Sequence, residues 1–288
     1  MKIYIDGEML DEADAKISVF DHGLLYGDGV FEGIRMYNGR VFRLEEHIDR
    51  LYDSARVIML EIGIDKRAMT DAVLETVRAN NLNEGYVRLV VTRGVGSLGL
   101  NPFQCPKASV IVIAANITLY APEKYQNGLK VVTCSTRRPT PASLSPAVKS
   151  LNYLNNVMAK GEAIHADADE GLMLNEQGYV AECTGDNLFI IRDGRITTPP
   201  VSSGSLPGIT WQVIFDIAAE KGVPIEEKQM TRYEIYTADE AFLTGTAAEV
   251  IPMVSLDQRP IGDGKPGEMT GAFIARFREI ASSTGAEI

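Results

Sequence analysis

The sequence predicts an α+β protein of two domains. Its 288 residues exceed the usual size of a single domain, so two packed domains are expected. Strand-like and helix-like segments are mixed without the strict alternation of a parallel α/β fold. Pro122 and neighbouring polar residues interrupt the pattern between Thr118 and Asn127. We therefore expect a small N-terminal α+β domain over residues 1–118, an interdomain loop over 119–126 and a larger C-terminal α+β domain over 127–288.

The first domain begins with short strands and turns. Ile3–Ile5 followed by Asp6-Gly7 predicts a strand and a turn, and Val30–Met36 predicts a strand that enters the hairpin signal Tyr37-Asn38-Gly39. Apolar residues spaced by three or four predict an amphipathic helix from Leu44 to Leu60. The other expected elements are one helix and two strands: Lys66–Asn80, Tyr86–Thr92 and Ala108–Ile117.

The second domain restarts with a strand at Leu129–Ser135. Helical periodicity predicts three helices: Tyr153–Ala166, Ile209–Lys221 and Thr270–Ala281. Short apolar runs bounded by turn residues predict four strands: Gly171–Leu174, Tyr179–Glu182, Leu188–Ile191 and Glu240–Leu243. The chain shows no internal repeat and no low-complexity tract.

Charge and hydropathy exclude two classes of partner. The chain has 39 acidic and 28 basic side chains, a net charge of −11, and no cluster of Lys and Arg that could neutralise phosphates. We therefore expect no nucleic-acid partner. The most apolar run, Val110 to Ala115, is far shorter than the ~20 residues that cross a bilayer. We therefore expect no membrane partner.

The cysteines and histidines predict neither disulfides nor a metal site. Three widely spaced cysteines, an odd number without C-x-x-C spacing, fit a reducing compartment. The first residues are acidic and carry no apolar signal segment, so a cytoplasmic location is expected. The three histidines share no ligand spacing: His22, His47 and His165.

Two glycine-rich segments are candidate anion sites. Gly94–Gly99 matches G-x-G-x-x-G, but Pro102 and the missing helical periodicity argue against the helix that a dinucleotide site needs. Ser202–Thr210 leads directly into a predicted helix, where backbone N–H groups and the Thr210 hydroxyl can hold an anion. On pattern alone, an ordinary helix start explains Ser202–Thr210 equally well.

Three charged residues have both a functional and an ordinary interpretation. Lys149 lies between a proline-punctuated loop and a helix, among apolar neighbours, where a lysine can attack a carbonyl carbon. Without further context, the pattern favours the ordinary interpretation of Lys149 as a solvated surface lysine. Glu182 ends a predicted strand before a turn, and Arg50 lies on the Leu44 to Leu60 helix. Both have ordinary roles as a turn carboxylate and a solvated helix residue.

Taken together, these segments resemble one family in order and spacing. The chain resembles branched-chain amino-acid aminotransferases of pyridoxal-phosphate fold type IV, the class IV aminotransferases, a fold also described as D-amino-acid aminotransferase-like. The matching stretches span nearly the whole chain: His22-Gly-Leu-Leu-Tyr-Gly-Asp-Gly-Val-Phe-Glu-Gly-Ile-Arg35, Glu46-His-Ile-Asp-Arg-Leu51, Lys149-Ser-Leu-Asn-Tyr153, Glu182-Cys-Thr-Gly-Asp-Asn-Leu-Phe189, Leu206-Pro-Gly-Ile-Thr210 and Thr244-Gly-Thr-Ala-Ala-Glu-Val250. Asp186 departs from the family, which more usually has glutamate in this turn, and Cys183 stands where glycine is frequent.

The resemblance implies pyridoxal 5'-phosphate as cofactor, lying between the two domains. Lys149 would bind the cofactor covalently and shuttle protons, and Glu182 would pair with the pyridine nitrogen and keep it protonated. The remaining cofactor-binding residues implied are four for the phosphate and two for the ring: Arg50, Ile209, Thr210 and Thr246, and Tyr153 and Leu206.

The resemblance also implies a substrate site. The turn Thr246-Ala247-Ala248 would bind the α-carboxylate, with Tyr86 and Arg88 nearby, and Tyr26, Phe31 and Gly33 would line the side-chain pocket. Leu98 and Leu100 stand where the related D-amino-acid enzymes carry an arginine and a histidine that grip the carboxylate. Their apolar side chains suit Val, Leu or Ile instead. Either Arg88 or Arg40 would receive the second carboxylate of glutamate, and the loop around Leu98 would reach a neighbouring subunit.

The expected activity is a ping-pong transamination. Branched-chain L-amino acids (Leu, Ile, Val) give their amino group to 2-oxoglutarate, which yields branched-chain 2-oxo acids and L-glutamate. Two activities of the same fold remain alternatives, a D-amino-acid aminotransferase and an aminodeoxychorismate lyase. A nucleotide-binding oxidoreductase rests only on the Gly94–Gly99 match, and a non-catalytic amino-acid-binding module is a further alternative. The expected partners are small-molecule amino acids and 2-oxo acids, with self-association as a homodimer or a higher homo-oligomer.

Overall fold

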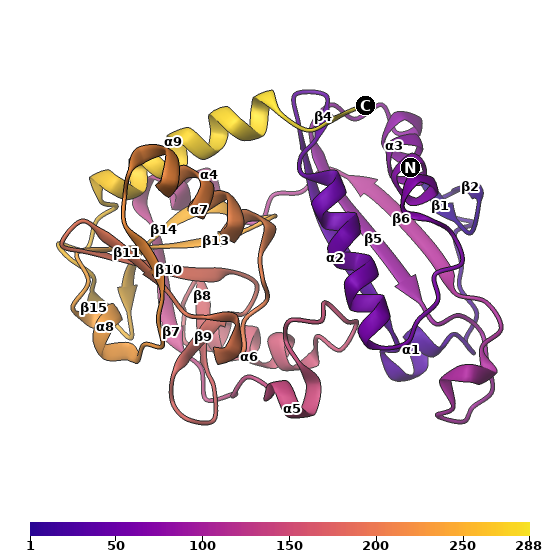
Figure 1. The fold of residues 1–288 in the computed structure, drawn as a ribbon, viewed down its shortest axis with the longest axis horizontal. Helices are drawn as coiled ribbons and strands as arrows, with labels where there is room; N and C mark the ends of the chain where they lie inside the picture. Colours follow the sequence, from indigo (N-terminus) through magenta and orange to yellow (C-terminus); the bar gives the residue numbers. More distant parts are fainter. The chain divides into compact units, whose positions relative to one another are not determined.

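The structure is a computed structural model that describes all residues from 1 to 288 (Figure 1). The chain divides into two compact units. The first unit comprises Met1–Ile117, Val148–Asn152 and Ala281–Ile288, and the second comprises Thr118–Ala147 and Tyr153–Ile280. The segment that carries Lys149 and the C-terminal residues therefore belong to the first unit, although the sequence pattern placed both in the second domain.

The first unit is an antiparallel sheet with two helices on one face. Its elements in chain order are β1 (Lys2–Ile5), β2 (Glu8–Asp11), α1 (His22–Tyr26), β3 (Gly29–Tyr37), β4 (Arg40–Val41), α2 (Leu44–Val57), α3 (Lys66–Ala79), β5 (Gly85–Thr92), the 3₁₀ helix η1 (Pro102–Gln104), β6 (Ser109–Ala115) and β16 (Ala286–Glu287). The seven strands lie in the order β16-β4-β3-β5-β6-β1-β2.

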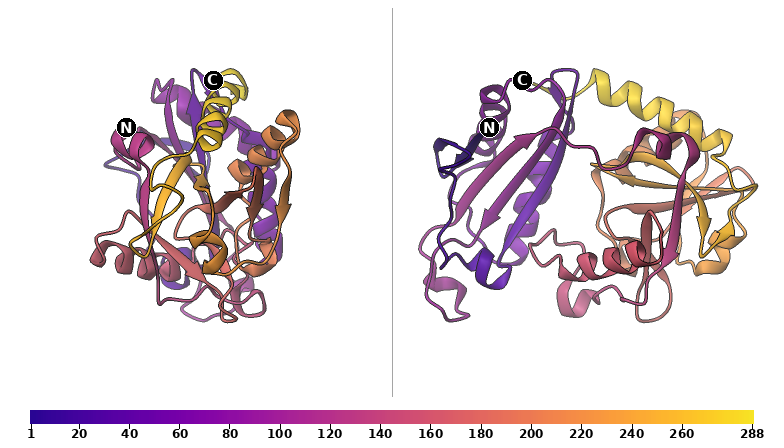
Figure 2. Two further views of the ribbon diagram at one scale, coloured as in Figure 1. Left: turned by 90° about the vertical axis from the view of Figure 1, so that its left-hand side faces the viewer. Right: turned by 180° about the vertical axis from the view of Figure 1, so that it is seen from behind.

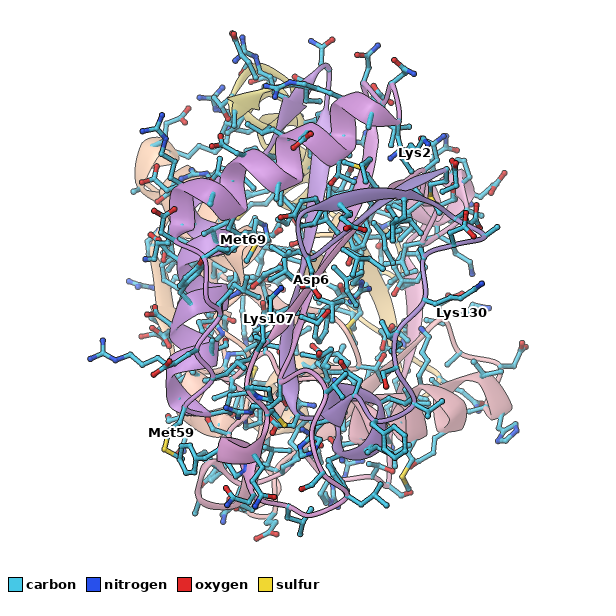
Figure 3. All side chains as sticks on the ribbon, turned by 90° about the vertical axis from the view of Figure 1, so that its right-hand side faces the viewer. Lys2, Asp6, Met59, Met69, Lys107 and Lys130 are labelled. Carbon is cyan, nitrogen blue, oxygen red and sulfur yellow. The ribbon has the colours of Figure 1, made fainter.

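The core of the first unit forms where alternate side chains of the strands point toward the helices. Val87, Leu89 and Val91 of β5 are buried with the apolar faces of α2 and α3, as the predicted periods of two and 3.6 require. Met69 of α3 lies in this core, whereas Met59, just beyond the end of α2, is exposed (Figure 3). Met59 has a positive φ of 53°, so α2 ends at Val57 rather than at the predicted Leu60.

The second unit is built on a larger mixed sheet. Its elements in chain order are α4 (Pro122–Asn127), β7 (Leu129–Thr133), α5 (Pro141–Leu144), α6 (Leu154–His165), β8 (Glu170–Leu174), β9 (Val180–Cys183), β10 (Asn187–Arg192), β11 (Arg195–Thr198), the 3₁₀ helix η2 (Val201–Ser203), α7 (Ile209–Lys221), β12 (Ile225–Glu227), α8 (Arg232–Tyr236), β13 (Glu240–Gly245), β14 (Glu249–Leu256), β15 (Arg259–Pro260) and α9 (Glu268–Ser283). The nine strands follow the order β12-β11-β10-β13-β14-β7-β8-β9, with β15 on β14.

Aromatic packing joins helices to this second sheet. Phe189 of β10 and Phe242 of β13 stack with their ring centres 4.9 Å apart. Phe273 of α9 stacks on Phe242, and Phe215 of α7 meets Phe189 edge-on, with ring centres 6.1 Å and 6.5 Å apart. Both helices can be followed in Figure 1.

The structure of the second unit differs from the sequence-based expectations at two places. The expected interdomain loop over 119–126 contains the helix α4, which begins with Pro122 at its first turn, where the missing N–H of proline has no helical partner in any case. The strand β14 was not predicted because Pro252 lies within it. The pairing of β14 with β7 begins only at Met253, so that ladder does not need the N–H that proline lacks.

No helix of the chain has both the length and the apolar character required to cross a membrane.

Candidate functional site

Lys149 is held along an open edge of the first sheet. The strand β4 is short and pairs only with the end of β3, which leaves the rest of that edge available. Phe31 N–H donates to the Lys149 carbonyl at 3.0 Å, and Leu151 N–H donates to the Gly29 carbonyl at 2.9 Å. The backbone around Lys149 is therefore fixed like a strand, although no strand pattern exists in its sequence.

A second contact fixes Lys149 from the side of α2. Lys149 N–H donates to the buried Ser54 hydroxyl at 3.2 Å. The ammonium group of Lys149 lies 4.7 Å from the ring centre of Phe31. The side chain thus begins at a rigid backbone position and passes over an aromatic ring. A residue that presents its amine to a ligand requires this kind of fixed position.

Three other predicted substrate residues lie on the same sheet face as Phe31. The guanidinium of Arg88 lies 4.8 Å from the Phe31 ring centre and 5.4 Å from that of Tyr86. Gly33 pairs with Arg88 across the strands, and a Cβ at Gly33 would lie 1.9 Å from the Tyr86 hydroxyl. Only glycine leaves room there for Tyr86. This face is opposite to the one covered by α2, since side chains alternate along β3 (Figure 2, right).

Arg50 is positioned by a buried carboxylate on the α2 side of the sheet. Glu32 is fully buried and accepts from Arg50 Nε at 2.7 Å and Nη2 at 2.8 Å, while His47 Nδ1 lies 2.8 Å from Glu32 Oε2. Burial alone would raise the pKa of Glu32, but the charge of Arg50 and the hydrogen bonds from His47 and Arg50 hold it well below its ordinary value. Burial lowers the pKa of His47, so its ring is neutral near pH 7. The arginine predicted to bind phosphate is therefore oriented by an ionised partner.

We expect Glu32→Gln to lower the free energy of unfolding by about 3 kcal/mol at pH 7, because Arg50 would keep its charge without the buried carboxylate. The folded-state pKa of Glu32 lies below its unfolded value of 4.5, so its contribution is present above pH 4.5 and is lost as the pH falls further. Urea unfolding of both proteins between pH 7 and pH 3 measures this. The difference between them should shrink as the pH falls below 4.5, and a constant difference would contradict the assignment.

The loop that carries Leu98 and Leu100 is anchored to α1. Tyr26 donates its hydroxyl proton to the Leu98 carbonyl, and His22 Nε2 lies 2.7 Å from the Ser97 carbonyl. Leu98 and Leu100 are 67% and 80% exposed, so the loop presents apolar side chains outward. Only the three-residue η1 follows Gly99, so the dinucleotide-binding interpretation of Gly94–Gly99 is wrong.

In the second unit, Glu182 is held as a buried carboxylate by donors from three segments. Its Oε1 accepts from Arg138 Nη2 at 2.6 Å, and its Oε2 accepts from the Leu206 N–H at 3.0 Å and from Asn187 Nδ2 at 3.2 Å. Arg138 is itself buried and also donates to the Gly204 carbonyl at 3.1 Å. This arrangement surrounds the Glu182 carboxylate with donors and fixes its direction.

The predicted phosphate segment begins the 13-residue helix α7 close to Glu182. Gly208 is the N-cap of α7 and offers no side chain to the first N–H groups, which include those of Ile209 and Thr210. The Asn187 side chain, which also donates to the Leu206 carbonyl at 2.9 Å, would lie 2.2 Å from a Cβ at Gly208. Asn187 therefore connects Glu182 to Leu206 and packs against Gly208, the residue before Ile209 and Thr210.

Thr246 and Ala247 belong to the same end of the second sheet. Asn187 of β10 pairs with Thr244 of β13, and the turn from Thr246 to Ala248 follows directly after β13. Tyr153 stands at the N-cap of α6, whose Asn156 accepts from Arg138 Nη1 at 3.0 Å. The second unit thus brings together the predicted residues Tyr153, Glu182, Leu206, Ile209, Thr210, Thr246 and Ala247, and the first unit holds the other predicted residues.

Sequence reasoning missed the residues that hold this predicted site in place. Glu32 and Asn187 lie inside stretches that resemble the family, so they could have been found there. Arg138 and Ser54 bond residues that are 44 and 95 positions away, and no local pattern marks them.

The chain is similar to known proteins over almost its whole length. The family model described as amino-transferase class IV matches residues 29–256. The chain belongs to the class IV aminotransferase family. A protein of Methanocaldococcus jannaschii is 50% identical over 288 residues, which cover 100% of this chain and 99% of that protein. The branched-chain-amino-acid aminotransferase of Pseudomonas aeruginosa is 43% identical, with 97% and 92% of the two chains covered.

Solved structures of class IV relatives share the whole fold. The Escherichia coli branched-chain amino acid aminotransferase superposes with a TM-score of 0.95 at 35% identity, covering 99% of this chain and 95% of that chain. The T.th. enzyme of the same name, with pyridoxamine 5'-phosphate, gives 0.94 at 38% identity, with 98% and 94% covered. The same enzyme was solved with N-(5'-phosphopyridoxyl)-L-glutamate and with 4-methylvaleric acid. These similarities confirm the fold-type IV resemblance and the α+β class.

The donor set of this class IV chain fits pyridoxal phosphate. A primary amine on a rigid backbone, Lys149, is present in one unit, and the other provides a fixed carboxylate, Glu182. The uncapped first turn of α7 suits a phosphate, because its N–H groups have no helical partners and the helix dipole favours an anion. Nothing in either unit conflicts with this cofactor.

Proposed function

We propose that this protein is a branched-chain-amino-acid aminotransferase that uses pyridoxal 5'-phosphate, transferring the amino group of Leu, Ile or Val to 2-oxoglutarate. The observation that carries the proposal is Lys149, fixed by three backbone hydrogen bonds around it and extended over Phe31. The family resemblance assigns Lys149 to the binding of the cofactor, which explains why its backbone is fixed more firmly than that of a solvated surface lysine.

The proposed cofactor-binding residues come from both units. Lys149 attaches to the cofactor and Arg50 binds its phosphate, together with the N–H groups of Ile209 and Thr210 and the hydroxyl of Thr246. Tyr153 donates to the ring hydroxyl oxygen, and Leu206 packs on the ring face. When bound, pyridoxal phosphate supplies an electron sink for the carbanion that forms at the amino-acid Cα.

The chain's own residues control charge and protons. Glu182, anchored by Arg138, holds a proton on the ring nitrogen. The Lys149 amine would move a proton between the amino-acid Cα and the C4′ atom of the cofactor. Because transfer runs in both directions, the same amine serves as base and acid in the two half-reactions of the proposed ping-pong cycle.

Substrate choice is proposed from the first unit. Phe31, Gly33, Tyr26 and Tyr86 form an apolar and aromatic surface for a branched side chain, with Leu98 and Leu100 from the anchored loop. Of the two arginines considered for the glutamate carboxylate, Arg40 pairs with Glu287 at 2.7 Å, whereas Arg88 lies beside Phe31 and Tyr86. This supports Arg88. The carboxylate of every substrate is assigned to the turn from Thr246 to Ala248.

Absorption spectroscopy tests the proposal. The purified protein should show a visible-edge band of bound cofactor that L-leucine diminishes, because the amino group would move to the cofactor, and 2-oxoglutarate should restore it. D-alanine and aminodeoxychorismate are offered in parallel as the substrates of the two alternative activities. A response to D-alanine alone would favour a D-amino-acid aminotransferase, and a protein without the band that binds nicotinamide cofactors would contradict the proposal.

We also propose that the chain self-associates. Helix α6 carries an exposed apolar stripe without a partner in the chain: Leu154, Val157, Met158 and Ile164. A stripe of this kind marks an interaction surface in soluble proteins. Light scattering that gives only the monomer mass of 31.5 kDa would contradict this proposal.

The cytoplasm is the proposed location, in keeping with three free cysteines.

A further inference from the structure

A buried pair of carboxyl groups lies in the second unit, close to Glu182. Glu170 of β8 and Asp186, in the turn between β9 and β10, are 2% and 4% exposed. The hydroxyl oxygen of Tyr120 lies 2.9 Å from Glu170 Oε2 and 3.3 Å from Asp186 Oδ2. The proposed function assigns no role to either carboxyl group. Two buried acids that share one phenol require an explanation.

Glu170 receives most of the hydrogen bonds made to the pair. Its Oε1 accepts from the N–H groups of Gly171 and Thr184 at 2.9 Å and 3.0 Å, and from the Thr184 hydroxyl. Its Oε2 accepts from Lys160 Nζ at 2.7 Å. The hydrogen-bonding capacity of Glu170 is therefore satisfied by donors from its own strand, from Thr184 and from α6.

Asp186 has far fewer donors than Glu170. The phenol of Tyr120 has one hydrogen, and Glu170 Oε2 is its nearer acceptor. Asp186 Oδ2 is the more distant acceptor of the same hydroxyl group, so this bond stabilises a charge on Asp186 only weakly. Burial, followed by the charge of Glu170, raises the pKa of Asp186 to about 7. Burial also raises the pKa of Tyr120, so the phenol keeps its proton.

Asp186 lies directly behind the turn that follows β13. A Cβ on Gly245 would lie 2.2 Å from Asp186 Oδ1, so the carboxyl group packs against the Gly245 backbone, one residue before Thr246. The other titratable groups that influence Asp186 are Lys160 of α6 and Glu182 of β9, and Cys183 is adjacent on β9. Glu249, the first residue after the turn, forms an ion pair in which its Oε2 lies 3.9 Å from Arg278 Nε of α9.

We propose that Asp186 is a specificity-determining positioning residue, which must stay neutral for the turn from Thr246 to Ala248 to accept a carboxylate. This inference rests on the proposed function for the identity of the ligand. An ionised Asp186 would place a negative charge behind the turn in a region of low dielectric, where like charges repel strongly. Affinity for a substrate carboxylate should therefore fall as Asp186 loses its proton.

Binding of 4-methylvalerate to the holoenzyme at pH 6 and pH 8.5 tests the proposal. This probe has a branched carbon chain and a carboxylate that is ionised at both pH values, but it has no amine to react. We expect its Kd to rise about tenfold between the two pH values in the wild type. In Asp186→Asn, which keeps the shape without the charge, the Kd should change less than twofold and stay near the wild-type value at pH 6.

The control is Asp193→Asn, the same change at an exposed position of the β10–β11 turn, which should retain the wild-type pH dependence. Infrared difference spectra between the two pH values give a second readout, a protonated carboxyl band that Asp186→Asn lacks. Full pH dependence of binding in Asp186→Asn, or the absence of that band from the wild type, would overturn the inference. A protein that shows the band but binds no 4-methylvalerate at either pH would overturn the proposed carboxylate turn while leaving Asp186 neutral.

Discussion

Lys149→Ala should abolish transamination, with kcat reduced by about 10⁴-fold or more, because the variant lacks both the amine that binds the cofactor and the base that moves the proton. The backbone around position 149 is held through its N–H and carbonyl groups, which alanine keeps. The fold should therefore be retained while covalent attachment of the cofactor is lost. Borohydride reduction followed by peptide mapping measures attachment, and a coupled assay with L-leucine and 2-oxoglutarate measures turnover.

The matched control for this variant is Lys130→Ala. Lys130 is exposed on β7, and its backbone N–H, which alanine keeps, makes the bond to Asp169 (Figure 3). This control should retain wild-type turnover and attachment. Reduction that labels a peptide without Lys149, or a Lys149→Ala variant with near-normal turnover, would remove the basis of the proposed function.

Glu182→Gln should lower kcat about 10²- to 10³-fold, because the amide cannot hold a proton on the ring nitrogen and the electron sink weakens. The change keeps the volume of the side chain, so the donors from Leu206 and Asn187 retain an acceptor oxygen. Arg138, in contrast, loses the charge that faces it at 2.6 Å. A weakened sink should act mainly on kcat, with a smaller effect on KM, and should shift the absorption band of the bound cofactor.

Glu176→Gln is the control, since Glu176 is exposed in the turn between β8 and β9 of the same unit. Its kinetics and spectrum should match those of the wild type. If Glu182→Gln kept the wild-type kcat, or reduced activity only by unfolding, Glu182 would be structural and the carboxylate beside the ring nitrogen would have to be sought elsewhere.

Helices and strands with strong periodicity were predictable from the sequence. The stretches that became α3, α7, β5 and β10 have apolar spacings that allow only one way to bury them, and their predicted bounds agree with the structure to within about one residue. Elements without such a spacing were missed. β14 contains a proline, and β12 and β16 are short edge strands whose pairing partners lie far away in sequence.

For the predicted site too, the sequence determined one part and only the tertiary structure determined the other. The sequence by itself determined the family, because six stretches with reactive residue types keep one order along the chain, and it named Lys149, Glu182 and Arg50. Only the tertiary structure decided what holds them, namely Ser54 and β3 for Lys149, Arg138 for Glu182, and Glu32 for Arg50. These are single contacts between segments that lie far apart in the sequence. A local sequence pattern indicates which residues are buried periodically, but it does not indicate which distant side chains form hydrogen bonds. The neutral state proposed for Asp186 belongs to this second class, because it depends on the burial of Asp186 beside Glu170 once the sheet has formed.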